Sequence, residues 1–326
     1  MSQQMIRQWL KVKVVSKREE ARDICSFELA DPAGRSLPPF GAGGHIDVEV
    51  SDQLIRQYSL CNHPGEHHRY LIAVLKDPNT RGGSLAMHER FKEGDLLNIS
   101  EPKNHFPLAA SAKKSLLFAG GIGVTPILCM AERLAQTGAD FEFHYCARSL
   151  DRMAFVERIK QSAFATKASL HLDDGPEAQK LDIKRVLAKP QPDVHIYVCG
   201  PTGFMNWVLK TAEDNHWPEE QVHREYFAAA AQPAGLAAGE FEVQIASTGT
   251  TYLVPANKSI TNLLREQGLD IPTSCEEGVC GTCLTRVLEG VPDHRDLFLS
   301  SKEQARNDQM LPCCSRAKSS KLVLDL

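Results

Sequence analysis

The 326-residue sequence lacks any apolar run long enough to span a membrane, and its N-terminal stretch MSQQMIRQWLKVKVV contains no hydrophobic signal region or cleavage site. It also lacks a large net charge, because the formal charge at pH 7 is only −4. Proteins that bind nucleic acid, or that bind a membrane through a basic face, carry an excess of Lys and Arg. We therefore expect neither a nucleic-acid partner nor a membrane partner. The composition is typical of a globular protein, and we expect it to reside in the cytoplasm.

Ten cysteines would permit disulfides in a secreted protein, but without an export signal we expect thiols and metal ligands in a reducing cytosol. Four of them have the spacing C-x4-C-x2-C-x29-C, which is typical of plant-type [2Fe-2S] ligands: Cys275, Cys280, Cys283 and Cys313. Gly278 and Gly281 allow the backbone angles that such a loop requires, so its N–H groups can face the sulfurs.

Two alternatives remain open for these cysteines, a zinc site and ordinary buried thiols. Structural zinc sites commonly use two closely spaced cysteine pairs, and the sequence has only one C-x2-C pair, at Cys280 and Cys283. Cys314 adjoins Cys313 and could replace it as the fourth ligand. Only Cys313 gives the 29-residue gap, so we predict Cys313.

Periodicity predicts three domains and one linker. Residues 1–110 alternate short apolar-patterned runs at 10–14, 24–30, 46–50, 56–60, 69–76 and 95–100 with turns and one helix at 85–91, which indicates a small antiparallel β-barrel. Residues 111–227 alternate strands at 115–119, 141–146, 168–172 and 194–199 with helices at 126–136, 153–160, 181–188 and 204–215, which indicates a doubly wound parallel α/β sheet.

The remaining third begins with a tract made almost entirely of Ala, Gly and Pro. This tract, at residues 228–239, has no apolar face to bury and is predicted to be a linker. Residues 240–326 form the last domain, with a hairpin at 241–246 and 252–254, and a helix at 259–267 that Ser259 caps and Gly268 ends. A final strand is predicted at 322–326.

Two short motifs in the first domain predict a flavin site. In Arg56-Gln57-Tyr58-Ser59, an arginine can bind a flavin phosphate through paired hydrogen bonds, and a tyrosine offers a flat surface. Arg81-Gly82-Gly83-Ser84 precedes the predicted short helix, where glycines and free N–H groups suit a phosphate. Alone, the first motif also fits an ordinary strand, and Ser84 also fits a helix N-cap. Their presence together, upstream of a nucleotide-type domain, favours the flavin.

A nicotinamide nucleotide site is predicted in the second domain. A strand leads into the glycine turn GGIGVTP at residues 120–126, and Pro126 suits the first position of the following helix. The turn departs from G-x-G-x-x-G, so the residues alone leave its ligand open. Cys199-Gly200-Pro201 ends a later strand, and loops at the carboxyl ends of parallel strands can converge on one ligand. Cys199 also fits a small buried residue before a turn.

Taken in this order, R-x-Y-S, R-G-G-S, G-G-I-G-V-T-P, C-G-P and the four-cysteine motif resemble the phthalate dioxygenase reductase family over essentially the whole chain. Longer runs are similar to family members that serve aromatic O-demethylases: RQYSLCNHP at 56–64, LLFAGGIGVTPILCMAE at 116–132, HREYF at 223–227 and CEEGVCGTCLTRVLEGVPDHRDLFLS at 275–300. The resemblance implies an FMN-binding barrel, an NAD-binding domain and a β-grasp ferredoxin domain.

The resemblance also implies roles for individual residues. Arg56 and Ser84 would bind the FMN phosphate, and Tyr58 would lie along the flavin. Ser59 near flavin N5 and Cys199 beside the nicotinamide are the two catalytic candidates. Either Tyr226 or Phe227 would cover the flavin. The whole predicted cofactor-binding set is Arg56, Gln57, Tyr58, Ser59, Ala73, Gly82, Gly83, Ser84, Gly121, Ile122, Gly123, Thr125, Pro126, Arg148, Cys199, Gly200, Pro201 and Phe227.

These cofactors imply a function, because NADH gives two electrons as a hydride and a [2Fe-2S] cluster accepts one at a time. A flavin accepts both and releases them singly, so it belongs between them. The resemblance thus implies a monomeric, NADH-dependent reductase that passes electrons to a Rieske-type terminal oxygenase. FMN over FAD and NADH over NADPH rest on the resemblance, and Arg148 stands where a 2′-phosphate could be met. The oxygenase partner stays open between an aromatic O-demethylase and another Rieske oxygenase, phthalate-type or other. Two functions of other kinds also stay open, an iron–sulfur redox sensor and a reductase of diffusible carriers.

Overall fold

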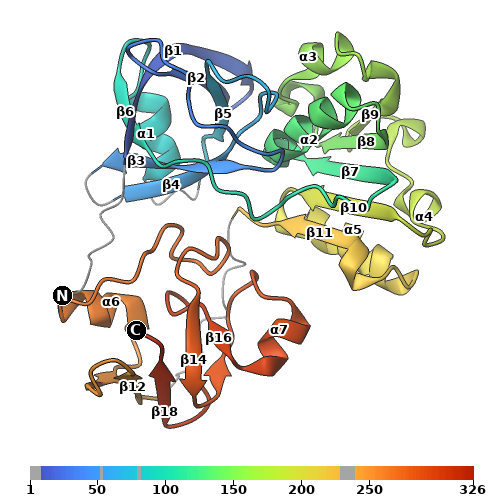
Figure 1. Cartoon of the computed structure of the whole chain (residues 1–326). Coiled ribbons are helices and arrows are strands. Elements are labelled where there is room, and N and C mark those ends of the chain that lie inside the picture. The colour runs from blue at the N-terminus through green and yellow to red at the C-terminus, as the bar shows by residue number, and fades with distance from the viewer. Residues whose placement is uncertain (1–8, 52–53, 79–81, 228–238) are drawn as a thin grey trace. The chain divides into compact units, whose positions relative to one another are not determined.

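The computed structural model describes residues 9–51, 54–78, 82–227 and 239–326 (Figure 1). The chain divides into two compact units, Met1–Glu225 and Tyr226–Leu326, and each is described by itself. The predicted linker at 228–239 lies outside the described residues except for Gly239. Within the described ranges, every helix is too short or too polar to cross a membrane.

The first unit begins with an antiparallel β-sheet, as predicted. Its six strands have the order β4-β3-β6-β1-β2-β5. The chain just after β4 forms a bridge with β5 through Leu60 and Ile72, which joins the two outer strands and closes the sheet into a barrel. The elements are β1 (Leu10–Ala21), β2 (Ile24–Ala30), β3 (His45–Ser51), β4 (Leu54–Ser59), β5 (Tyr70–Leu75), the helix α1 (Gly83–Glu89) and β6 (Leu96–Ile99).

A parallel sheet completes the first unit, with strand order β11-β10-β7-β8-β9. Its strands are β7 (Lys114–Gly120), β8 (Asp140–Ala147), β9 (Ala168–Leu172), β10 (Val194–Cys199) and β11 (Val222–Glu225). The α-helices are α2 (Val124–Gln136), α3 (Val156–Lys160), α4 (Ile183–Val186) and α5 (Thr202–Asp214). Short 3-10 turns lie at Gly121–Gly123, Leu150–Arg152, Ala165–Lys167, Glu177–Gln179 and Glu219–Gln221. Because the strand order reverses beside β7, the carboxyl ends of β7 and β10 flank the switch point at which such sheets bind ligands.

The barrel and the parallel sheet share a core. One continuous cluster of buried side chains joins Phe106 and Ala73 of the barrel segment to α2 residues such as Met130, and reaches Phe143 on β8. A second cluster fills the barrel interior, with Ile46 and other strand residues fully buried. The shared core fixes the barrel against the sheet, so the side chains between them have defined positions.

The second unit is the predicted β-grasp domain. Its main sheet has the order β13-β12-β18-β14-β16, in which β12 and β18 pair in parallel and a two-stranded β15-β17 ribbon lies apart. The elements are β12 (Phe241–Ile245), β13 (Thr251–Val254), α6 (Ile260–Glu266), β14 (Thr285–Glu289), β15 (Pro292–Asp293), α7 (Ser301–Arg306), β16 (Gln309–Met310), β17 (Arg316–Ala317) and β18 (Lys321–Leu324). Ser259 caps α6 as predicted, because its side chain accepts from the N–H of Asn262.

Some element boundaries differ from the predictions, and several elements were not predicted. The helix α3 begins at Val156 rather than at residue 153, because Met153 is extended and Phe155 adopts a left-handed φ of 61°. Strand β11 and strands β14 to β17 were not predicted, since most of them are only two to five residues long. The helix α7 was also missed, although Ser300 and Glu303 form a capping box that the sequence displays.

Candidate functional site

Strand β4 carries the first flavin motif and presents its residues to both faces of the barrel wall. In the register with β3, Arg56 and Tyr58 pair with Val48 and Ile46, which lie in the barrel core. Directly paired residues point to the same face, so Arg56 and Tyr58 lie on the core side and Ser59 on the other. Burial raises the pKa of Tyr58, so its hydroxyl stays protonated.

Two further predicted flavin residues are engaged with the barrel itself. Gln57 Nε2 donates to Asp47 Oδ1 at 3.0 Å and lies 3.3 Å from His45 Nε2. Ala73, on β5, is 5% exposed and packs into the shared core. Both residues therefore shape the wall of the candidate site by packing and hydrogen bonding.

The second flavin motif lies directly against the first. A Cβ on Gly83 would stand 2.6 Å from Cγ of Arg56, so only a glycine lets the arginine side chain cross the start of α1. Arg81 lies outside the described residues. Ser84 is not the N-cap of α1, a position held by Gly82, and its Oγ instead accepts from the N–H of Asp77 at 3.2 Å. The structure thus brings Arg56, Gly82, Gly83 and Ser84 together at one place.

The glycine turn and the Cys199 loop meet at the carboxyl ends of β7 and β10. A Cβ on Gly123 would stand 2.3 Å from the carbonyl oxygen of Cys199, and one on Gly200 would stand 2.9 Å from Cα of Gly120. These approaches are possible only without side chains. The two loops therefore converge, as the sequence predicted, and Pro201 follows at the start of α5.

The helix after the glycine turn starts earlier than predicted. It begins at Val124, so Pro126 is the third helical residue rather than the first. The N–H groups of a first helical turn have no partner within the helix, so a proline is tolerated at this position too. Thr125 is 2% exposed, and its Oγ1 donates to the carbonyl of Ile122 at 3.1 Å, which holds the turn.

Glu225 was not predicted and connects the two halves of the site. Ser59 Oγ donates to Glu225 Oε2 at 3.2 Å, and Glu225 pairs in register with Cys199 across β11 and β10. Burial raises the pKa of Glu225 to about 8, against a smaller opposing effect of the Ser59 hydrogen bond. Burial, followed by the charge of Glu225, also raises the pKa of the Cys199 thiol. The carboxyl and the thiol are therefore mostly protonated at neutral pH.

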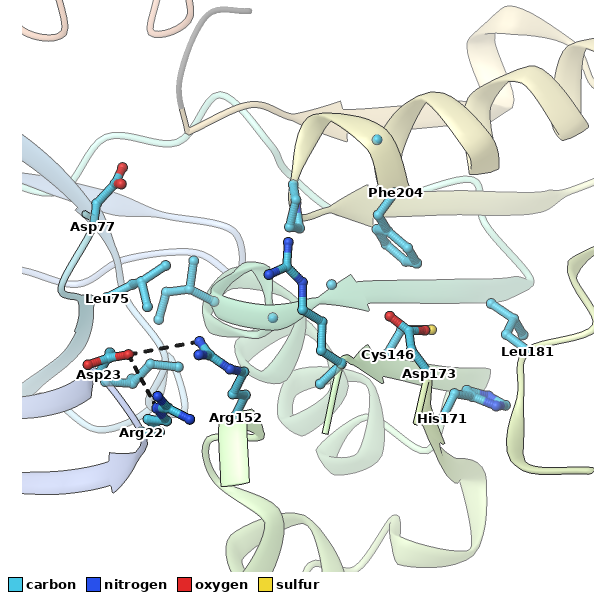
Figure 2. Close-up of a pocket in the computed structure, with 18 of the residues that line it drawn as sticks. Arg22, Asp23, Leu75, Asp77, Cys146, Arg152, His171, Asp173, Leu181 and Phe204 are labelled. Carbon is cyan, nitrogen blue, oxygen red and sulfur yellow. Dashed lines mark ion pairs between the residues drawn. The ribbon is translucent and has the colours of Figure 1, made fainter. Parts of the chain in front are cut away.

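A pocket of about 1510 Å³ opens within the first unit (Figure 2). Four predicted residues line it, Gly121, Ile122, Arg148 and Pro201. Figure 2 shows Asp173, His171 and Phe204 toward one end of the pocket, and Asp23, Arg22 and Asp77 toward the other. The pocket is thus lined by the barrel and by the parallel sheet, and it is large enough for a dinucleotide or flavin ligand.

Phe227 is the one residue of the predicted flavin and nucleotide set that belongs to the second unit. Its side chain is 41% exposed. Its neighbour Tyr226 is partly buried.

The four predicted cluster cysteines lie near one another. Cys275 and Cys280 are close enough to shift each other's pKa, and Cys313 lies close to both Cys283 and Cys314. In the part of the chain that the structure describes, no three His, Cys, Asp or Glu side chains converge to hold a single metal ion. The thiols of the predicted set therefore meet around one loop, as the plant-type ligand spacing requires.

The loop around these cysteines has the geometry that a cluster needs. Gly278 and Gly281 have φ values of 75° and 73°, and Glu276 has a φ of 57°. The N–H of Glu277 donates to Cys275 Sγ at 3.4 Å, and the N–H of Gly278 faces Cys313 Sγ. Such N–H groups stabilise negative charge on sulfur. The donor set and the loop geometry therefore fit a [2Fe-2S] cluster.

Cys314 occupies a different environment from Cys313. Its Sγ lies 3.7 Å from the carbonyl oxygen of Leu311 and 3.8 Å from Ser315 Oγ. A Cβ on Gly278 would stand 2.4 Å from Cys314 Sγ, so this thiol packs beneath the cysteine loop. Cys313 lies close to both Cys283 and Cys314, so the 29-residue gap remains the reason to prefer Cys313 as the fourth ligand.

Comparison with known proteins agrees with this geometry. Residues 243–318 match the family of 2Fe-2S iron-sulfur cluster binding domains. The chain is 58% identical to a vanillate O-demethylase oxidoreductase of Pseudomonas putida over 315 residues, covering 96% of this chain and 98% of the relative. It is 41% identical to a phthalate dioxygenase reductase of Burkholderia cepacia, over 98% of both chains. The chain belongs to the phthalate dioxygenase reductase family.

Solved structures support the same assignment. A phthalate dioxygenase reductase, described as a modular structure for electron transfer from pyridine nucleotides to [2Fe-2S], superposes with a TM-score of 0.73 over 98% of each chain. A type IV self-sufficient cytochrome P450 monooxygenase gives 0.87 over 98% of this chain but only 41% of its own. Family membership confirms the predicted class, an electron-transfer oxidoreductase of oxygenase systems, and the predicted cofactors FMN, [2Fe-2S] and NADH.

Proposed function

We propose that the chain is the reductase component of vanillate O-demethylase, and that it delivers single electrons from NADH to a Rieske-type oxygenase. The observation that carries the proposal is the 58% identity to a vanillate O-demethylase oxidoreductase over almost the full length of both chains. A second vanillate O-demethylase oxidoreductase is 53% identical and a third is 46% identical. A tert-butanol monooxygenase reductase subunit is 45% identical, and phthalate-type reductases are 41% and 42% identical.

FMN would bind at the junction of β4 and α1. Arg56 would bind its phosphate beside Gly82, Gly83 and Ser84, since the missing side chain at Gly83 lets the guanidinium reach this place. Tyr58 and Ser59, on opposite faces of β4, would contact the flavin ring from its edge and its face. FMN, when bound, accepts two electrons together as a hydride and releases them one at a time.

The nicotinamide would lie where the glycine turn meets the Cys199 loop. Gly121 and Pro201 line the pocket there, Gly123 lets the turn pack against the Cys199 loop, and Cys199 with Glu225 would border the ring. Loss of a hydride leaves the nicotinamide ring positively charged, and a carboxyl that borders the ring would stabilise that charge to the extent that it is ionised. Because burial raises the pKa of Glu225 to about 8, this carboxyl is mostly protonated at pH 7 and gives only part of that stabilisation.

The adenosine would lie at the end of the pocket that contains Asp173, and this end would favour NADH over NADPH. Asp173 follows β9 and lies close enough to Cys146 to raise the pKa of that thiol, together with the larger effect of burial. A carboxylate here accepts hydrogen bonds from ribose hydroxyls and repels a 2′-phosphate. Arg148 lines the same pocket and would contact the nucleotide phosphates. An Asp173→Asn variant should therefore use NADPH better relative to NADH.

In the second unit, Cys275 and Cys280 would bind one iron, and Cys283 and Cys313 the other. The functional division would be an FMN domain at 1–110, an NAD domain at 111–227, a linker at 228–239 and a ferredoxin domain at 240–326. We also propose that the protein acts as a monomer in the cytoplasm. A linker on the ferredoxin domain would let one cluster serve both the flavin and the oxygenase.

The test is reduction of the purified, flavin-loaded protein by NADH without oxygen, followed by addition of the oxygenase component of a vanillate O-demethylase. We expect the flavin and cluster absorbance bands to bleach together and the vanillate to be demethylated. Bleaching with no demethylation, but with turnover of a phthalate dioxygenase oxygenase, would assign another partner. No bleaching at all would favour an iron–sulfur sensor.

The FMN assignment has its own test. An Arg56→Ala variant should retain less FMN after gel filtration, because a phosphate dianion loses its paired hydrogen bonds, while the cluster absorbance stays unchanged. Arg35→Ala is the matched control, since Arg35 is a 76% exposed barrel arginine paired with Asp31 on the surface. Equal flavin occupancy in both variants would contradict the phosphate role of Arg56.

A further inference from the structure

Two arginines in the pocket share one carboxylate. Arg22 Nε lies 3.9 Å from Asp23 Oδ2, and Arg152 Nη1 lies 3.8 Å from the same oxygen. Dashed lines mark these two ion pairs in Figure 2. Both distances are too long for hydrogen bonds. In the ranges that the structure describes, neither guanidinium makes another hydrogen bond to a side chain or carbonyl, although Arg22 Nη1 lies 3.7 Å from Asp151 Oδ2. The arginines of this Arg22–Asp23–Arg152 cluster therefore have N–H donors that could bind a ligand.

Backbone hydrogen bonds hold the two segments that carry the cluster next to their neighbours. The N–H of Arg22 donates to the carbonyl of Asp151 at 2.7 Å, and the carbonyl of Asp23 accepts from the N–H of Lys76 at 2.7 Å. Asp23 occupies the turn between β1 and β2 with a left-handed φ of 64°. Two side chains of the barrel and one from the α/β half are thus brought to the same pocket wall.

The position of Arg152 points to a nucleotide ligand. It lies a few residues beyond the carboxyl end of β8, next in space to the β7 and β10 ends where ligands of such sheets bind. The same pocket is lined by Gly121 and Pro201. Arginine donors that are only loosely paired are suited to a phosphoryl anion, which forms short, charge-assisted hydrogen bonds.

We propose that the Arg22–Asp23–Arg152 cluster binds the pyrophosphate of NADH, with Arg152 and Arg22 as the donors and Asp23 as a carboxylate that competes with the ligand for them. This inference rests on the proposed function, since it assigns a subsite for that coenzyme. The barrel would then contribute directly to the nucleotide site through Arg22. Asp23 would weaken the binding of both coenzyme forms, which favours release of the oxidised coenzyme after each turnover.

Because Asp23 competes with the ligand, the proposal predicts that removing its charge raises the affinity for the nucleotide. Removing an ion-pair partner ordinarily weakens a structure, but removing the charge of Asp23 should strengthen nucleotide binding, because both arginines become available and a repulsive charge is lost. Asn is a suitable replacement, because it tolerates a left-handed backbone as well as Asp does. Arg152→Gln removes the cationic donor while keeping a long polar side chain.

The experiment is titration of the FMN-loaded protein with ADP-ribose, which contains the pyrophosphate but no nicotinamide, by isothermal calorimetry at two salt concentrations. We expect Arg152→Gln to bind at least about tenfold more weakly, and with a shallower salt dependence. Asp23→Asn should bind several-fold more tightly. Arg35→Gln and Asp31→Asn, which change a paired Arg and Asp on the barrel surface outside the pocket, are the matched controls and should not change the affinity.

Two results would overturn the proposal. If Asp23→Asn binds ADP-ribose no more tightly and melts at a lower temperature, the cluster is only a structural contact between the β1–β2 turn and residues 150–152. If Arg152→Gln loses FMN while its ADP-ribose affinity is unchanged, the arginine serves the flavin phosphate instead. Failure of the proposed function gives a different result, in which ADP-ribose binds as expected but NADH does not bleach the flavin.

Discussion

Replacing Glu225 by Gln should remove a pH dependence of stability that this buried carboxyl creates. Burial raises its pKa from 4.5 to about 8. Below pH 4.5 the carboxyl is protonated in both the folded and the unfolded chain, so it does not lower the free energy of unfolding. Above that pH the unfolded chain ionises first, so stability falls as the pH rises from 4.5 to about 8 and is constant beyond.

The size of the effect follows from the difference between these two pKa values. At about 1.4 kcal/mol per pH unit, the full cost is about 5 kcal/mol, and about 3 kcal/mol of it is already present at pH 7. A glutamine cannot ionise and can still accept the Ser59 hydrogen bond. The variant should thus match the wild type near pH 4.5 and become progressively more stable than the wild type toward pH 8.

Urea unfolding at several pH values between 5 and 8.5, followed by tryptophan fluorescence, measures this difference. All three tryptophans, Trp9, Trp207 and Trp217, belong to the first unit, so the signal reports on the unit that contains Glu225. Glu220→Gln, an exposed neighbour, is the matched control and should leave the pH profile unchanged. A Glu225→Gln profile parallel to that of the wild type, or a variant less stable at pH 8, would refute the reasoning.

Two other predictions concern the nucleotide turn and the cluster. Gly123→Ala should cost about 1–3 kcal/mol of stability and slow flavin reduction by NADH, because its Cβ would meet the carbonyl oxygen of Cys199 at 2.3 Å. Gly203→Ala, whose Cβ would meet nothing within 4 Å, should leave the melting temperature unchanged. Cys313→Ser should abolish the cluster absorbance, whereas Cys314→Ser should retain it; the opposite pattern would exchange the two ligand roles.

Much of the fold was predictable from the sequence because local patterns agree with the tertiary structure. Strands β2, β9 and β10 coincide with the predicted runs, since their apolar residues are continuous or alternate cleanly between turns. The parallel sheet follows from the alternation of strands with helices. The short strands of the second unit were not predictable, because a two-residue strand has no periodicity and exists only through its partner.

The candidate site divides in the same way. The four cysteines, the glycine turn and the R-x-Y-S strand are visible in the sequence because each chemistry requires particular residues at a fixed local spacing. The expected parallel sheet also predicted the convergence of the Gly120–Gly123 turn with Cys199, since the carboxyl ends of parallel strands lie at one edge of a sheet. The sequence by itself thus determined the class of the protein and its cofactor chemistry.

Other features were decided only by the tertiary structure. Glu225 gains its role because β11 lies beside β10 and its carboxyl reaches Ser59, a residue 166 positions away in the chain. Asp23 and Arg152 are ordinary charged residues in the sequence and become a cluster only where the barrel turn meets residues 150–152. Burial sets the pKa of Glu225, and two arginines share one carboxylate, only because segments that are distant in the sequence pack together. Local sequence patterns do not predict such packing.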